Sequence, residues 1–282
     1  MALRRGPAFL FMEILGRAPQ SWWARVQAPL IAVLFLFVQV ESAVAGALER
    51  AMLGKSQVVD LSQAQIESAS VVEAQEHPRP DGMGEKEPNQ PARRIPATGE
   101  LVTCLYLPST VLKGLPTVAQ IPTRDLLAHA VVVDIAPRVA QAADYRLSVE
   151  DLRAWERRNG RIPKASMVLF HTGWARRWSA NDPARYLNLD LQGVPRVPGI
   201  SPEAVAFLLN ERDIRGVGLD SWVPEVVPGG KDGTRPLLSA GKWQLVNLTN
   251  LDRLPAKGIK LVIAPLRVDA GAAPARVIAI LP

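Results

Sequence analysis

The sequence of 282 residues is 48% hydrophobic and 21% charged, and it contains one cysteine. The apolar content excludes a wholly disordered chain, and the single cysteine excludes a disulfide-rich scaffold. The net charge is +6, but the basic residues are spread along the chain and no nucleic-acid-binding module is visible. We therefore expect a mixed, solvated surface and no nucleic-acid partner. A metal-dependent mechanism would have only three histidines available, His77, His129 and His171.

The N-terminal region has the pattern of a secretory signal peptide. An apolar run at residues 30–38 follows Arg17 and Arg25, and a small-x-small sequence then ends at Ala45. The run is shorter than the roughly 18–20 residues of a membrane-spanning helix. We predict that residues 1–45 are a signal peptide cleaved near Ala45, that the protein is exported to the periplasm or secreted, and that no stable membrane span is left after cleavage. An uncleaved signal that anchors the chain to the membrane is the alternative.

The rest of the chain is predicted to form a short N-terminal segment, residues 46–56, and one domain, residues 57–282. Within the domain, residues 73–96 are polar and rich in Pro, Glu and Gln, which predicts an exposed loop. Short runs of β-branched and other apolar residues predict strands. These strands are expected at residues 58–62, 130–135, 167–171, 216–220, 261–264 and 277–281.

Two helices are predicted from the residues that begin them. Ser148 is followed three positions later by Asp151, which is the spacing of a capping box. Ser201 precedes Pro202, and proline is favoured at the first position of a helix. Strands interleaved with helices indicate a single α/β domain with a central sheet. The lone Cys104 lies among apolar residues, so we expect it to be buried and inert.

Several short motifs occur in a fixed order along the domain. They are Val59-Asp60-Leu61-Ser62, Gln120-Ile121-Pro122, His171-Thr172-Gly173-Trp174, Pro198-Gly199-Ile200-Ser201, Gly218-Leu219-Asp220-Ser221, Asn247-Leu248-Thr249-Asn250-Leu251 and Ala273-Pro274-Ala275-Arg276. This ordered set resembles the cyclase family, which includes bacterial kynurenine formamidase and isatin hydrolase. The resemblance implies a swivelling β/β/α fold, with a mixed sheet or barrel-like core flanked by helices. It also implies metal-dependent hydrolysis of C–N bonds other than peptide bonds, as in the aryl formamides of tryptophan catabolism.

The family binds zinc or manganese mainly through the motif H-x-G-T-H-x-D-x-P-x-H, together with a histidine and a glutamate nearer the C-terminus. A catalytic ion needs about three protein ligands and an open position for the water it activates. When the glycine of the motif is placed on Gly99, the ligand positions carry side chains that bind metals poorly or not at all. These positions are Ala97, Leu101, Thr103, Leu107, Thr234 and Val246. We therefore expect the family's metal site to be absent and no cofactor to be bound.

The remaining catalytic candidates are His171, Asp220 and Ser221. One interpretation makes His171 an acid or base, and the other makes it a strand-end histidine satisfied by backbone groups. Ser221 would act as a nucleophile only with a histidine base within hydrogen-bonding reach. The resemblance adds three residues to a substrate pocket, namely Trp174, Trp222 and Glu225.

The sequence favours an exported member of the cyclase family without the metal site, a pseudoenzyme that binds a small aromatic or cyclic amide. One alternative is an active amide hydrolase with a site rebuilt around His171, Asp220 and Glu225. Another is a structural or partner-binding periplasmic protein. The resemblance also implies a homodimer.

Overall fold

The computed structural model describes residues 49–63, 102–178, 183–191, 195–222 and 234–282. The predicted signal peptide and the predicted loop at residues 73–96 lie outside these ranges. Residues 1–56 and 57–282 are separate compact units, and residues 49–52 of the first unit are helical. The other features described here belong to the second unit. Among the described residues, no helix is both long enough and apolar enough to cross a membrane.

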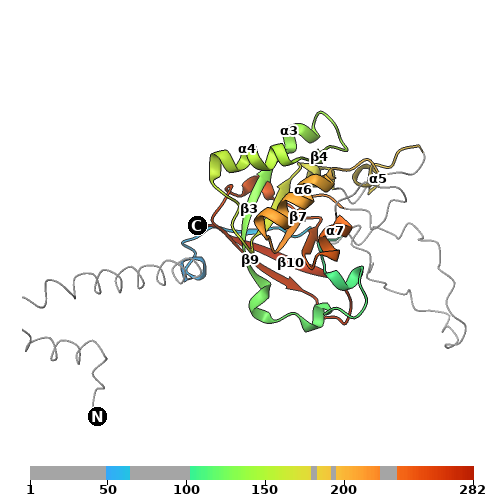
Figure 1. Ribbon diagram of the computed structural model, residues 1–282. Helices are drawn as coiled ribbons and strands as arrows, with labels where there is room; N and C mark the ends of the chain where they lie inside the picture. The colour runs from blue at the N-terminus through green and yellow to red at the C-terminus, as the bar shows by residue number, and fades with distance from the viewer. Residues whose placement is uncertain (1–48, 64–101, 179–182, 192–194, 223–233) are drawn as a thin grey trace, which may run out of the picture. The chain divides into compact units, whose positions relative to one another are not determined.

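Eight strands of the described chain form one mixed sheet that closes on itself (Figure 1). The strand order is β1-β10-β2-β8-β7-β5-β3-β9, and β10 also pairs with β9, so that seven strands form a barrel-like layer. The strands are β1 (Val58–Asp60), β2 (Cys104–Tyr106), β3 (Leu127–Asp134), β5 (Met167–His171), β7 (Gly216–Leu219), β8 (Trp243–Val246), β9 (Ile259–Pro265) and β10 (Ala272–Ile280). A separate parallel pair joins β4 (Arg146–Leu147) to β6 (Gly199–Ile200).

The helices are short. The α-helices are α3 (Ala136–Val139), α4 (Val149–Asn159), α5 (Pro183–Leu187), α6 (Pro202–Phe207) and α7 (Thr234–Ser239). The π-helical η5 (Leu208–Arg212) follows α6. The 3-10 turns are η1 (Pro108–Thr110), η2 (Val118–Gln120), η3 (Thr123–Leu126), η4 (Trp174–Arg177) and η6 (Leu251–Arg253). The two helices that the sequence predicts, α4 and α6, begin where expected. The capping box of α4 is confirmed, because the Ser148 hydroxyl accepts from the Asp151 amide and the Asp151 carboxylate accepts from the Ser148 amide. The Ser201 hydroxyl likewise accepts from the Ala204 amide, 3.1 Å away, at the start of α6.

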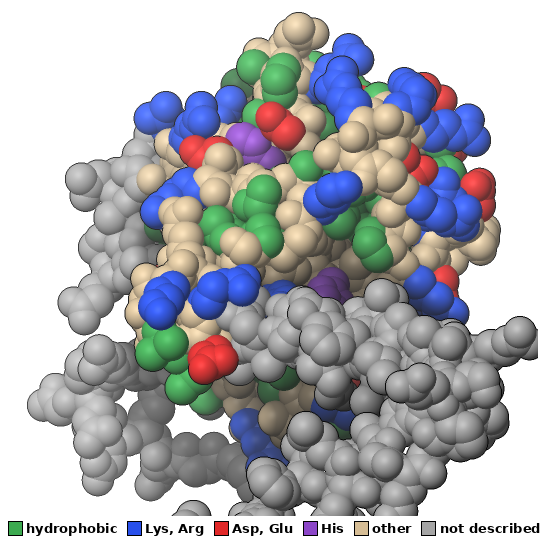
Figure 2. Space-filling view, turned by 90° about the vertical axis from the view of Figure 1, so that its left-hand side faces the viewer, with side chains coloured by type: hydrophobic (Ala, Val, Ile, Leu, Met, Phe, Trp, Pro, Cys, Tyr) green, Lys and Arg blue, Asp and Glu red, His purple; other side chains and the backbone are tan. Residues whose placement is uncertain are grey.

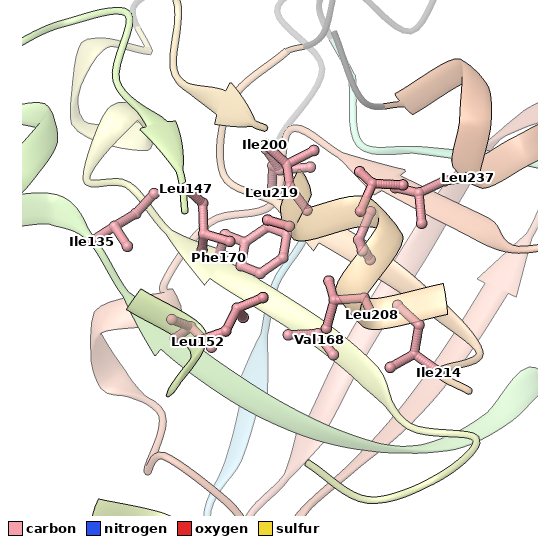
Figure 3. Packing of buried hydrophobic residues seen from close by; sticks show 14 of the residues in the cluster. Ile135, Leu147, Leu152, Val168, Phe170, Ile200, Leu208, Ile214, Leu219 and Leu237 are labelled. Carbon is pink, nitrogen blue, oxygen red and sulfur yellow. The ribbon is translucent and has the colours of Figure 1, made fainter. Parts of the chain in front are cut away.

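Alternate residues of the central strands enter two different hydrophobic layers. On β3, Val131 and Val133 pack with the helices, whereas Ala130 and Val132 pack on the opposite face with residues of β9 and β10. Figure 3 shows the helix-side layer, in which Phe170 lies between Leu147 and the α6 region. This alternation is what a sheet buried on both faces requires. The predicted α/β domain with a barrel-like core flanked by helices is therefore confirmed.

The predicted strands at residues 130–135, 167–171 and 216–220 correspond closely to β3, β5 and β7, but β2 and β8 were not predicted. Each of these two is only three or four residues long, so its periodicity carries little information. β3 begins three residues earlier than predicted and includes His129, which is exposed and pairs in register with Lys260 on β9.

A partly buried ion pair joins α4 to η5. Arg212 donates from Nε and Nη2 to the two oxygens of Glu156, both at 2.7 Å, and the Glu156 carboxylate also accepts from the Ile162 amide. The two side chains are only 9% and 13% exposed. The hydrogen bonds from Arg212 lower the pKa of Glu156 below its ordinary value of 4.5.

We expect Glu156→Gln to lower the free energy of unfolding by about 2 kcal/mol at pH 7, because Arg212 loses the carboxylate that accepts from two of its nitrogens. The folded-state pKa of Glu156 is lowered, so its stabilisation is present above the unfolded-state pKa and is lost as the pH falls through the folded-state pKa. Urea unfolding should therefore show the two proteins converging as the pH falls below about 4. Glu150→Gln, at an exposed position of the same helix, is the control and should cost less than about 0.5 kcal/mol. A difference between wild type and Glu156→Gln that persists at low pH would contradict the assignment.

Candidate functional site

The carboxyl ends of four parallel strands meet at one edge of the sheet. β3, β5, β7 and β8 run in the same direction, and Asp134 lies in register with His171 at the ends of the first two. Asp220 and Ser221 follow β7, and Asn247 follows β8. Ligands of α/β sheets bind at this edge, which makes it the candidate site.

Asp220 is buried and organises the turn that follows β5. Its Oδ1 accepts from the Thr172 amide at 2.8 Å and from the Thr172 hydroxyl at 2.5 Å, while Oδ2 accepts from the Gly173 amide at 2.9 Å. Gly173 has a φ of 73°, a left-handed conformation that glycine adopts without strain. Burial raises the pKa of Asp220, although the hydrogen bonds from Thr172 and the nearby His171 oppose this rise. Asp220 therefore holds the turn in place.

His171 is paired with a carboxylate that sequence reasoning did not identify. Its Nδ1 lies 2.9 Å from Oδ1 of Asp134, and the His171 side chain is 11% exposed. A carboxylate accepts hydrogen bonds, so Nδ1 carries the proton and Nε2 is left for another partner. Both residues line a cleft of about 450 Å³ between α4, η6 and the ends of β3 and β5. The pairing of Asp134 with His171 could have been suspected, since His171 ends one predicted buried strand and Asp134 is the next-to-last residue of another.

Ser221 and Trp222 are buried polar side chains that lack partners in the described part of the chain. The Ser221 hydroxyl and the Trp222 Nε1 have no hydrogen-bond partner there, and the two residues are 0% and 5% exposed. Nearby, the hydroxyl of Tyr186 donates to Oδ1 of Asn247 at 2.7 Å. Burial and the charge of Asp220 raise the pKa of Tyr186, although a backbone hydrogen bond at Trp222 opposes this, so the phenol is neutral.

The described residues at the expected ligand positions do not fit a divalent ion. The Thr103 hydroxyl already donates to the Asn247 carbonyl at 2.6 Å and accepts from the Gln63 amide at 2.7 Å. Val246 and Leu107 are buried and apolar. Thr103 and Leu107 also lie at opposite ends of β2, about 13 Å apart at strand spacing. Among the described residues there is no group of three or more His, Cys, Asp or Glu side chains that could hold a metal.

The structure separates several of the other sequence-predicted residues. Trp174 is buried in the helix-side layer, where its Nε1 donates to the Tyr186 carbonyl, so it does not line the cleft of His171. Cys104 is buried, as predicted. Thr234 begins α7. Ala97, Leu101, Glu225 and His77 lie outside the described residues. The structure gives no hydrogen bond between His171 and either Asp220 or Ser221. Asp220 accepts from Thr172 instead, and the Ser221 hydroxyl has no partner among the described residues.

Comparison with known proteins assigns the chain to a family. The family model named Cyclase matches residues 59–226, which is more than half of the chain. The chain belongs to the cyclase family. An isatin hydrolase of Roseibium aggregatum is 34% identical over 165 residues, and this match spans 60% of the length of that protein.

Solved structures of the cyclase family agree with the fold. Isatin hydrolase A from Labrenzia aggregata, bound to benzyl benzoate, has a TM-score of 0.63 and 30% sequence identity, and the match covers 87% of this chain and 98% of the other. Isatin hydrolase A from Ralstonia solanacearum has a TM-score of 0.68 and 28% identity, with 86% and 97% covered. The family and the fold inferred from the ordered motifs are thus confirmed.

Proposed function

We propose that this cyclase-family protein binds a small cyclic or aryl amide and does not hydrolyse it through a bound metal ion. The observation that carries the proposal is the hydrogen bonding of Thr103, which stands at an expected ligand position. Its hydroxyl donates to the Asn247 carbonyl and accepts from the Gln63 amide. Val246, which pairs with Cys104 in the register of β2 against β8, is apolar. A divalent ion needs oxygen, nitrogen or sulfur ligands with free lone pairs. Val246 offers none, and the Thr103 hydroxyl is already engaged as both donor and acceptor.

Two buried donors support amide binding. Leaving a buried donor without a partner costs about 1–3 kcal/mol, and both Ser221 Oγ and Trp222 Nε1 are in this state among the described residues. An amide carbonyl would accept a hydrogen bond from such a donor, and an aromatic ring would pack against the indole of Trp222. The similarity to isatin hydrolases points to the same ligand class, since isatin is a cyclic amide with an aromatic ring.

Isothermal titration of the EDTA-treated protein with isatin tests the proposal. We expect binding without consumption of isatin, and Trp222→Phe should weaken binding by about fivefold or more because it removes the Nε1 donor. Ser221→Ala should weaken it in the same direction. Trp243→Phe is the matched control, since Trp243 lies on β8 and contacts Arg215. Absence of binding, or equal weakening by Trp243→Phe, would overturn the proposal.

A further inference from the structure

The cleft beside His171 has the size and the walls of a small-molecule site. Its volume of about 450 Å³ falls within the roughly 300–1,000 Å³ of such sites. Trp155 of α4, Leu251 and Leu254 are among the residues that line it, so the cleft has apolar surface for the body of a ligand. Neither Ser221 nor Trp222 lines it, and the cleft is therefore separate from the site of the proposed function.

The carboxylates that line this cleft already have partners. Asp134 accepts from His171 and from the Ala136 amide. Asp151 accepts from the Ser148 amide and from the Tyr145 hydroxyl. Asp252 pairs with Arg176 at 3.8 Å. Each of these three carboxylates thus has at least one partner in the protein.

The two arginines that line the cleft, unlike these carboxylates, have no ion-pair partner among the described residues. Arg138 of α3 and Arg158 of α4 both line the cleft. Neither has a carboxylate within ion-pair distance among the described residues. A guanidinium binds a carboxylate through two parallel hydrogen bonds, which makes an arginine without an ion-pair partner a recognition group when it lines a cleft. His171 also lines the cleft, and Asp134 occupies its Nδ1, which leaves Nε2 as the ring nitrogen available to a ligand.

We propose that this cleft binds a small organic carboxylate with an apolar or aromatic body. Arg138 and Arg158 bind the carboxylate, the surfaces of Trp155, Leu251 and Leu254 hold the apolar part, and Nε2 of His171 contacts the ligand. The charge pattern favours a carboxylate over a cation, because the lining carboxylates are already paired while the lining arginines are not.

Titration with sodium benzoate, followed by NMR of the histidine rings, tests the site. The His171 signal is assigned from its loss in His171→Gln. We expect benzoate to shift the His171 signal and to leave the His129 signal in place. Benzamide, the neutral analogue, should bind at least about tenfold more weakly because it lacks the charge that the arginines recognise. Sodium phosphate, which has the charge but no apolar body, should also bind more weakly than benzoate.

The variant Arg138→Gln/Arg158→Gln should weaken benzoate binding by about tenfold or more. Arg157→Gln is the matched control, since Arg157 lies on the same helix but does not line the cleft, and it should bind as wild type does. Equal binding of benzoate and benzamide, unchanged binding by the double variant, or a shift of His129 as large as that of His171 would overturn the proposal. The isatin titration of the Trp222 variant is independent of this result.

Discussion

Replacing Asp220 with alanine is expected to lower the free energy of unfolding by about 4 kcal/mol. The carboxylate accepts three hydrogen bonds from Thr172 and Gly173, and the residue is 2% exposed. Alanine leaves two buried backbone amides and a hydroxyl without an acceptor, at a cost of about 1–3 kcal/mol for each group that finds no water. Relief of the buried charge offsets part of this loss, since burial raises the pKa of Asp220.

Asp220→Asn separates the hydrogen bonds from the charge. Asparagine keeps one acceptor oxygen for Thr172 but turns an amide donor toward the Gly173 amide. We expect a loss of about 2 kcal/mol, between wild type and alanine. Chemical denaturation of the three proteins provides the measurement. If Asp220→Ala were as stable as wild type, Asp220 would not organise the turn after β5.

Gly216→Ala is expected to destabilise the protein by about 3 kcal/mol through overpacking. Gly216 lies on β7 beside Trp243 of β8 in a parallel register. A methyl group added at Gly216 would collide with the backbone carbonyl of Trp243, which cannot rotate away as a side chain would. The close approach of these two strands holds Asp220 and Asn247 at the same edge.

Gly241→Ala is the control for the effect of removing a glycine. Gly241 has a φ of 81° but open space where a methyl group would lie, so its replacement should cost about 1 kcal/mol from backbone strain alone. Thermal unfolding of both variants compares the two costs. A smaller loss for Gly216→Ala than for Gly241→Ala would contradict the steric explanation.

Much of the fold could be predicted because its signals are local. Ser148 and Asp151 lie three residues apart, and the apolar strands β3, β5 and β7 each form one continuous run. Closure of the sheet could not be predicted in this way, because it depends on the pairing of β10 with β9 and on the three-residue β2, which contributes almost no periodicity. The ordered motifs supplied the barrel-like expectation instead.

The candidate site was only partly predictable, because its contacts join residues far apart in the chain. Asp134 pairs with His171 across 37 positions, and the hydroxyl of Tyr186 reaches Asn247 across 61. A sequence offers His171 many possible carboxylate partners, and only the register of β3 against β5 selects Asp134. The side chains at Leu107 and Val246 could be judged from residue type alone, since an apolar side chain is no ligand in any fold. Thr103 could be judged only from the structure, where its hydroxyl already has a donor and an acceptor.

Metal analysis of the purified protein tests the central claim most directly. The protein is incubated with excess manganese or zinc, freed of unbound metal by gel filtration, and measured by elemental mass spectrometry, with isatin consumption followed on the same sample. The account predicts well under one equivalent of either metal and no consumption of isatin that depends on metal. About one equivalent of retained metal, accompanied by hydrolysis that EDTA abolishes, would contradict it.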